Sequence, residues 1–204
     1  MGQRRLSLLD VVMRIKQNLK AYVDMTNASE IARRYFVTNA FDTALGLIGL
    51  VMGSYVVKVS DPMIILSTGF GTAFAVFLSG FVGTYLMERA ERLRELHELE
   101  RSMLVSLENS LLERAQKTAS LLVALASGVA ALFASAVILS PFAFAHLGLG
   151  SIEIAYFWAL AQGLLFLFIL GFFMGRISRE NKILYGVLAM FLGLLIALLG
   201  IFIR

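Results

Sequence analysis

Five long stretches without charge constrain the fold of this chain more than any other feature. Four of them contain no charged or histidine residue, and a fifth is interrupted only by Asp42; they cover 62–87, 118–145, 154–175, 183–203 and 35–57. About 20 apolar residues in a helix match a hydrocarbon core of about 30 Å. Only 16% of the residues are charged, against about 25% in an ordinary soluble domain. We therefore expect an all-α polytopic membrane protein with five transmembrane helices.

The positions of lysine and arginine predict the orientation of these spans. Of the 18 lysines and arginines, only Lys58 and Arg204 lie outside three regions: the residues before the first span, 88–117 and 176–182. Because basic residues concentrate at cytoplasmic ends, the amino terminus is predicted in the cytoplasm and the carboxyl terminus outside. We expect the cell membrane of a prokaryote. The same bias and contact with anionic membrane lipid explain the net charge of +4 without nucleic acid.

The chain divides by composition into four parts. These are a cytoplasmic or interfacial segment over 1–34, the first two spans over 35–87, a cytoplasmic Glu-rich helical hairpin over 88–117, and the last three spans over 118–204. Within the first part, residues 7–23 place Leu8, Val12 and Ile15 on one helical face, which predicts an amphipathic helix. That helix either lies on the inner leaflet or packs on the cytoplasmic part of the same protein.

The short hairpin is predicted from the 88–117 connection, which contains neither glycine nor proline. One unbroken helix would carry the chain about 45 Å from the membrane at about 1.5 Å per residue, so it has to fold back. Ser110 and Glu113 have capping-box spacing, and the preceding Asn109 tolerates a turn, which places the break near 106–109. Comparable signals predict helix starts after Asn27, Asp61 and Ser151.

Carboxylates form a stripe along the first helix of the hairpin. At about 100° per residue they fall within a sector of roughly 80°, and they are Glu88, Glu91, Glu95 and Glu98. Like charges at this spacing are unfavourable by about 0.2–0.5 kcal/mol per pair, whereas clustered oxygens suit a divalent cation. Met103 or His97 would add a softer ligand for iron or manganese. The alternative is a solvated face held by ion pairs such as Glu88 with Arg92.

An apolar sector adjoins this stripe and has no partner of adequate size within the connection. It contains Leu96, Leu99, Met103 and Leu107. We therefore expect two copies of the hairpin to meet through it in a homodimer.

Asp42 is the only charged residue inside the spans. An ionisable group there is costly to desolvate and indicates a functional site. Asn39 and Thr43 lie nearby in sequence, and Gly46, Gly49 and Gly53 give a small-residue face for close helix approach. The alternative is that Asp42 only forms hydrogen bonds near the inner interface.

Taken together, these features resemble the vacuolar iron transporter family. They are five spans, an early aspartate in "AFDTALGL", a glycine-rich second span that runs into a glutamate-rich helix, and a return helix into the third span. The resemblance implies a homodimer that exports ferrous iron or manganese from the cytoplasm in exchange for protons. It gives Asp42 a place on the path between subunits and Glu88, Glu91, Glu95 and Glu98 a role in collecting metal, with Glu113 on the return helix.

Three positions depart from the family pattern. Phe41 stands in place of an asparagine, and Phe77 and Phe81 stand where the family has a methionine and a glutamate that face the path. Asn39, Met52 and Thr84 are the residues that could replace those path ligands. These departures leave an alternative open: a non-transporting dimeric membrane protein whose cytoplasmic glutamates bind or sense metal.

Enzymatic function is the least favoured class. The two histidines, His97 and His146, lie outside the spans, and the chain has no cysteine. "HELER" is not the His-Glu-x-x-His zinc motif. We expect no catalytic activity and no organic cofactor, with the divalent metal as substrate or ligand.

Overall fold

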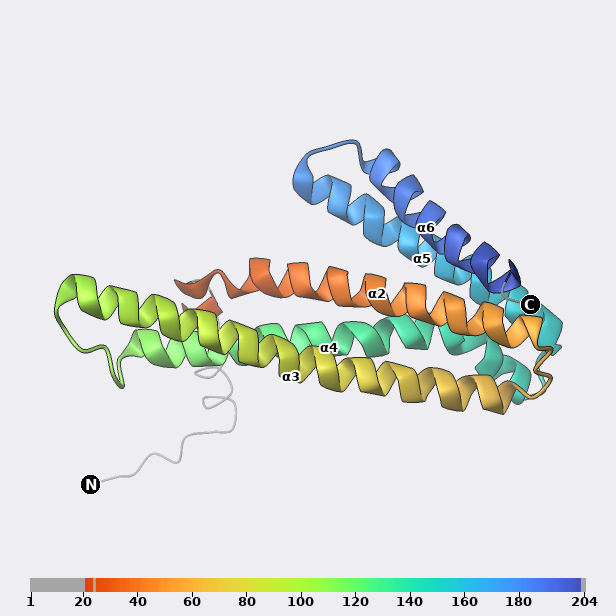
Figure 1. Cartoon of the computed structure of the whole chain (residues 1–204), viewed down its shortest axis with the longest axis horizontal. Coiled ribbons are helices and arrows are strands. Elements are labelled where there is room, and N and C mark those ends of the chain that lie inside the picture. Colours follow the sequence, from red (N-terminus) through yellow and green to blue (C-terminus); the bar gives the residue numbers. More distant parts are fainter. Residues whose placement is uncertain (1–20, 24, 203–204) are drawn as a thin grey trace, which may run out of the picture. The chain divides into compact units, whose positions relative to one another are not determined.

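The computed structural model describes residues 21–23 and 25–202. Across these residues it is helical and contains no strand. The five long helices are α2 (Ala28–Val56), α3 (Pro62–Met103), α4 (Leu111–His146), α5 (Ile152–Ser178) and α6 (Lys182–Phe202) (Figure 1). Each includes a stretch long and apolar enough to cross a membrane. The predicted all-α architecture with five candidate spans is confirmed, whereas nearly all of the predicted amphipathic helix at 7–23 lies outside the described residues.

Local capping sets the starts of α3 and α5 where the sequence predicts them. The Met63 amide donates to Asp61 Oδ1 at 2.8 Å, just before the first turn of α3. Ser151 Oγ accepts from the Ile154 amide at 3.5 Å and caps α5. Before α2, Asn27 has a φ of 51°. It therefore forms a left-handed turn instead of the extended N-cap that its spacing suggested.

The break between α3 and α4 is also confirmed. α3 ends at Met103 and α4 begins at Leu111. The Glu113 amide donates to Ser110 Oγ at 3.2 Å, and Glu113 Oε2 accepts from the Asn109 amide at 2.7 Å. This reciprocal pair satisfies amides that no helical carbonyl can reach.

The chain separates into two compact units. Among the described residues, the first combines 21–23 and 25–35 with 81–126, and the second combines 36–80 with 127–202. Among the described residues of the first unit, a small core forms around Ala28, Ala119 and Val123. The second unit has the larger core, with side chains from all five helices, including Leu47, Ile65, Ile138, Leu167 and Ala197.

α5 and α6 form an antiparallel pair through small residues (Figure 1). Gly171 faces the Tyr185 carbonyl, and a Cβ at Gly171 would lie 2.7 Å from the Ala189 Cβ. One turn later, a Cβ at Gly175 would lie 2.8 Å from the Lys182 Cα. Small side chains let the two backbones approach closely, which is how helices associate in membranes.

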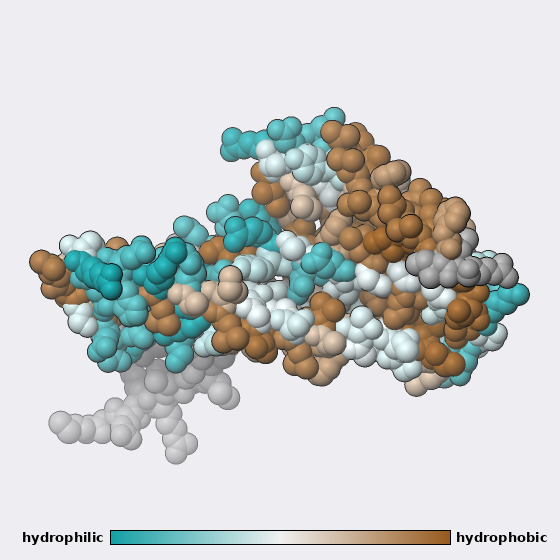
Figure 2. Space-filling view, in the orientation of Figure 1, coloured by the Kyte–Doolittle hydropathy of each residue, from teal (hydrophilic) through white to brown (hydrophobic). Residues whose placement is uncertain are grey.

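The outward faces of these helices are apolar. Figure 2 shows hydrophobic residues covering the visible face of the α5–α6 pair, while hydrophilic residues gather over the hairpin of α3 and α4. Trp158, Phe157 and Leu188 are among the many large exposed apolar side chains. A soluble monomer rarely exposes so much apolar surface, so contact with lipid accounts for it and the chain is an integral membrane protein.

Candidate functional site

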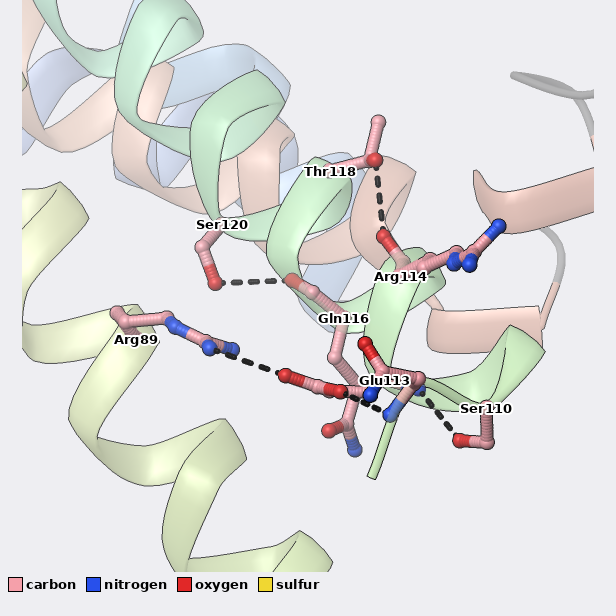
Figure 3. Close-up of polar contacts among 8 residues, drawn as sticks. Arg89, Ser110, Glu113, Arg114, Gln116, Thr118 and Ser120 are labelled. Atoms are coloured by element: carbon pink, nitrogen blue, oxygen red, sulfur yellow. Dashed lines mark hydrogen bonds and ion pairs between the residues drawn. The ribbon is translucent and has the colours of Figure 1, made fainter. Parts of the chain in front are cut away.

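The most concentrated group of charges lies where α3 and α4 run side by side in the hairpin. Arg89 of α3 points toward Glu113 of α4, with 3.7 Å between Nη2 and Oε1 (Figure 3). Because Glu113 also accepts from the Asn109 amide, its carboxylate both caps α4 and joins the two helices. A predicted metal ligand therefore has structural partners.

Glu88 and Arg92 form a buried ion pair on the same helix. Their side chains are 10% and 6% exposed, and Arg92 Nε lies 3.3 Å from Glu88 Oε2. The alternative predicted from the sequence was an ion pair on a solvated face. The ion pair between Glu88 and Arg92 is present, but it is buried and not solvated. Its charges are desolvated, which makes their mutual attraction stronger and their isolation more costly than at a surface.

Several polar atoms around these pairs are buried without a hydrogen-bond partner among the described residues. They are Arg89 Nη1, Arg92 Nε, Arg92 Nη2 and Gln116 Oε1. Gln116 lies three residues after Glu113 on α4, and Ser120 donates to the Gln116 carbonyl at 3.0 Å (Figure 3). The sequence analysis missed Gln116, although the three- and four-residue spacing of Glu113, Gln116 and Ser120 marks one helical face.

The remaining glutamates of the stripe face outward. Arg94 bonds Glu91 and also approaches Glu98, with 3.8 Å between its Nε and Glu98 Oε1. Glu95 is exposed and lines an open groove of about 430 Å³ together with Glu98, Leu99 and Ser102. Met103, at the end of α3, is 60% exposed.

The predicted metal ligands are therefore divided between two faces and largely held by arginines. Four of the five glutamates have an arginine within ion-pair distance, namely Glu88, Glu91, Glu98 and Glu113. Within residues 21–23 and 25–202, no three Asp, Glu or His side chains lie close enough to hold a metal ion. A cation bound here would have to displace an arginine or engage fewer carboxylates.

The predicted dimer contact of the hairpin is wrong at Leu96. Leu96 is only 3% exposed, and it continues the buried line of Glu88 and Arg92 at four-residue spacing. Leu99 and Met103 do remain exposed. Packing within the chain therefore buries Leu96, one of the apolar residues that we expected to contact a second copy.

Asp42 alone of the three predicted path residues lies on an exposed face. Its neighbours Thr43 and Ala44 are buried in the same turn of α2. Asn39 is partly buried and donates to the Ser127 carbonyl at 2.7 Å, and Met52 is buried in the larger core. Gly46 and Gly53, four and eleven residues after Asp42, are also exposed.

Two of the three phenylalanines that depart from the vacuolar iron transporter pattern, Phe77 and Phe41, pack inside the larger unit. A Cβ at Gly128 of α4 would lie 2.9 Å from Phe77 Cδ2, so that ring occupies the space beside the glycine. Phe41 packs against the larger core, and Phe81 is partly buried. Thr84, the third suggested replacement ligand, is buried on α3.

The structure reveals one further face that the sequence analysis missed. Along α3, small residues recur at every fourth position and all are exposed: Ser67, Gly71, Ala75 and Ser79. The spacing continues in the sequence to Gly83. Such small-xxx-small patterns are typical of close helix contacts in membranes.

Comparison with known proteins identifies a relative. The chain is 30% identical to "Uncharacterized protein MJ0645" of Methanocaldococcus jannaschii over 179 residues, which cover 86% of this chain and 90% of the relative. The chain belongs to the same family as MJ0645. No family model matches the sequence, and no solved structure matches it. Because the name of MJ0645 states no activity, the resemblance to vacuolar iron transporters stays a prediction.

Proposed function

We propose that this member of the MJ0645 family is a homodimeric membrane exporter of a divalent transition-metal cation, ferrous iron or manganese. The observation that carries the proposal is the exposed position of Asp42 on α2, inside an apolar stretch. A carboxylate there is unfavourable against lipid, so it needs a water-filled path, a cation or a partner surface. A second copy of the chain provides such a surface.

Symmetry explains how one aspartate per chain can serve a divalent ion. If the exposed faces of two α2 helices meet at a twofold axis, two Asp42 carboxylates approach the same site. Their combined charge matches that of one divalent cation, and oxygen ligands suit such ions. Gly46 and Gly53, exposed on the same helix, leave room for this approach.

The α3 face of Ser67, Gly71, Ala75 and Ser79 supports the same dimer. These positions are exposed in the single chain, and small residues at this spacing allow helix backbones to pack closely. Packing of this face against a second copy would remove it from lipid.

The glutamates of the hairpin complete the proposal. Glu91, Glu95 and Glu98 are exposed on α3 and would collect cations in the cytoplasm with micromolar affinity, because surface carboxylates remain partly hydrated. We place the amino terminus and the hairpin in the cytoplasm and the carboxyl terminus outside, in the cell membrane of a prokaryote. The proposal includes no enzymatic step, organic cofactor or nucleic acid.

Transport by the purified protein in liposomes tests the function. Mn²⁺ uptake would be followed with an internal fluorescent indicator, with and without an opposing pH gradient. We expect uptake above that of protein-free liposomes, and faster uptake when protons can move the other way. Liposomes that contain correctly folded protein but take up no Mn²⁺ under any gradient would contradict transport.

The non-transporting alternative has its own supporting observations. Arg92, Arg94 and Arg89 already hold the hairpin glutamates. Phe77 packs beside Gly128 at a position where the resemblance to vacuolar iron transporters implies a metal ligand. The liposome experiment separates the two functions, since this alternative expects Mn²⁺ binding to the hairpin without flux.

A further inference from the structure

The buried ion pair on α3 suggests how the cation affinity of the hairpin is set. Glu88 follows the 62–87 stretch of α3 directly, so it is the first carboxylate beyond the apolar residues of that helix. Its side chain and that of Arg92 are nearly fully buried, with 3.3 Å between Oε2 and Nε. A guanidinium at this distance offsets the negative charge that a metal cation would need from Glu88.

We propose that Arg92 is an internal competitor for Glu88: a divalent cation binds this carboxylate only by displacing the guanidinium. The inference rests on the proposed function, because it assumes that hairpin glutamates bind metal. It adds Arg92 as a residue that determines affinity without being a ligand.

The hydrogen bonding of Arg92 supports a displaceable guanidinium. Within the part of the chain that the structure describes, its Nε and Nη2 are buried and have no hydrogen-bond partner. The contact with Glu88 therefore lacks the bidentate geometry that makes arginine–carboxylate pairs strong. Buried donors without acceptors are unfavourable, so moving Arg92 into water would regain hydrogen bonds and offset part of the lost attraction.

Arg94 provides a matched comparison on the same helix. It pairs with Glu91 and Glu98, but all three side chains are more than half exposed. Exposed ion pairs are screened and contribute little. Removing the charge of Arg94 should therefore change cation binding much less than removing that of Arg92.

Calorimetric titration of the full-length protein in detergent with Mn²⁺ tests this inference. Arg92→Gln should tighten binding roughly tenfold, because a close, desolvated charge pair is lost. Arg94→Gln should change it less than about fivefold, as expected for an exposed pair. Adding Glu88→Gln to Arg92→Gln should return the affinity to the wild-type value, because the new site depends on Glu88.

Each other outcome has a definite meaning. If Arg92→Gln binds no tighter than wild type, or the double variant stays as tight as Arg92→Gln, the inference fails while the proposed function stands. If wild type binds no Mn²⁺, the proposed collection of metal by the hairpin fails and the inference fails with it. If Mn²⁺ binds as well after Glu91, Glu95 and Glu98 are all changed to Gln, collection by these three residues fails, and the Arg92 variants alone decide the inference. If neither Arg92→Gln nor Arg92→Met folds, Arg92 is a structural counter-ion and the inference is overturned.

Discussion

The side-chain amide of Asn39 on α2 donates to both the carbonyl and the hydroxyl of Ser127 on α4, at 2.7 and 3.1 Å. Gly80 of α3 lies against the same amide, because a Cβ at Gly80 would collide with Asn39 Nδ2. Three helices of one unit therefore meet at Asn39. Its amide is occupied by structural hydrogen bonds, which argues for a packing role at a position predicted to line a path.

Asn39→Ala should therefore destabilise the protein. The substitution removes this donor from the buried Ser127 groups, at a cost of roughly 1–3 kcal/mol. Thermal unfolding in detergent would measure a lower midpoint than wild type. Thr38→Ala, at the exposed neighbouring position, is the control and should unfold close to wild type. Equal midpoints for all three proteins would contradict a packing role.

Gly171→Leu should separate α5 from α6. A side chain at Gly171 would meet the Tyr185 backbone and the Ala189 Cβ, and neither can move without shifting α6. Overpacking of this kind typically costs about 1–3 kcal/mol. We expect a lower unfolding temperature and faster proteolysis near 179–181. Gly83→Ala, where a Cβ would meet nothing within 4 Å, should be neutral or slightly stabilising, because alanine favours helix.

Helix boundaries were predictable because they depend on residues close in sequence. Asp61 before Pro62, and Ser110 with Glu113, determine local hydrogen bonds whatever packs around them. The spans were predictable for a similar reason, since length and hydropathy of one segment decide whether it can cross a bilayer. Neither inference requires knowledge of a neighbouring helix.

The division of the glutamate stripe was not predictable from spacing. Glu88 turns inward and pairs with Arg92, while Glu91, Glu95 and Glu98 face outward. Which side of α3 is buried depends on where α4 lies, and a sector of roughly 80° spans the boundary between the two faces. The same reason explains the burial of Leu96 and the unforeseen position of Gln116. Asp42 could be singled out from the sequence because a lone charge in an apolar run is visible without knowledge of its neighbours, and its role stays a prediction.

The absence of cysteine from the sequence makes the orientation easy to test. Ser106→Cys places a thiol in the exposed turn of the hairpin, and Ser60→Cys places one in the turn before α3. With the amino terminus in the cytoplasm, a membrane-impermeant maleimide should label Ser60→Cys in intact cells. It should label Ser106→Cys only after the cells are permeabilised. The reverse pattern would invert the proposed topology.

Ala75→Leu should weaken the proposed dimer. Ala75 lies in the middle of the exposed small-residue face of α3, and a large side chain there would hold the two helices apart. Native mass measurement in mild detergent should show a larger monomer fraction than for wild type. Ala136→Leu makes the same change at an exposed alanine of α4 and should leave the dimer intact. A monomeric wild type, or equal effects of both variants, would exclude this face as the contact.

Asp42→Asn should abolish Mn²⁺ flux and leave Mn²⁺ binding to the hairpin unchanged. The amide keeps the shape of the side chain but removes the only negative charge within the five apolar runs. A divalent ion that enters hydrocarbon without a counter-charge faces a barrier of tens of kcal/mol by Born estimates, which neutral oxygens seldom offset. Calorimetry on the detergent-solubilised variant measures binding, and the liposome assay measures flux.

The control for this experiment is Thr38→Val, one helical turn before Asp42 and also exposed on α2. It removes a polar group from the same helix but no charge, so flux should persist. Loss of flux in both variants would point to general damage of α2. A cation that passes residue 42 without a counter-charge faces a prohibitive free-energy barrier. Equal flux in Asp42→Asn and wild type would therefore show that the cation does not pass this residue and that its carboxylate does not serve transport. The position of Asp42 would then reflect only its hydrogen bonding near the membrane interface.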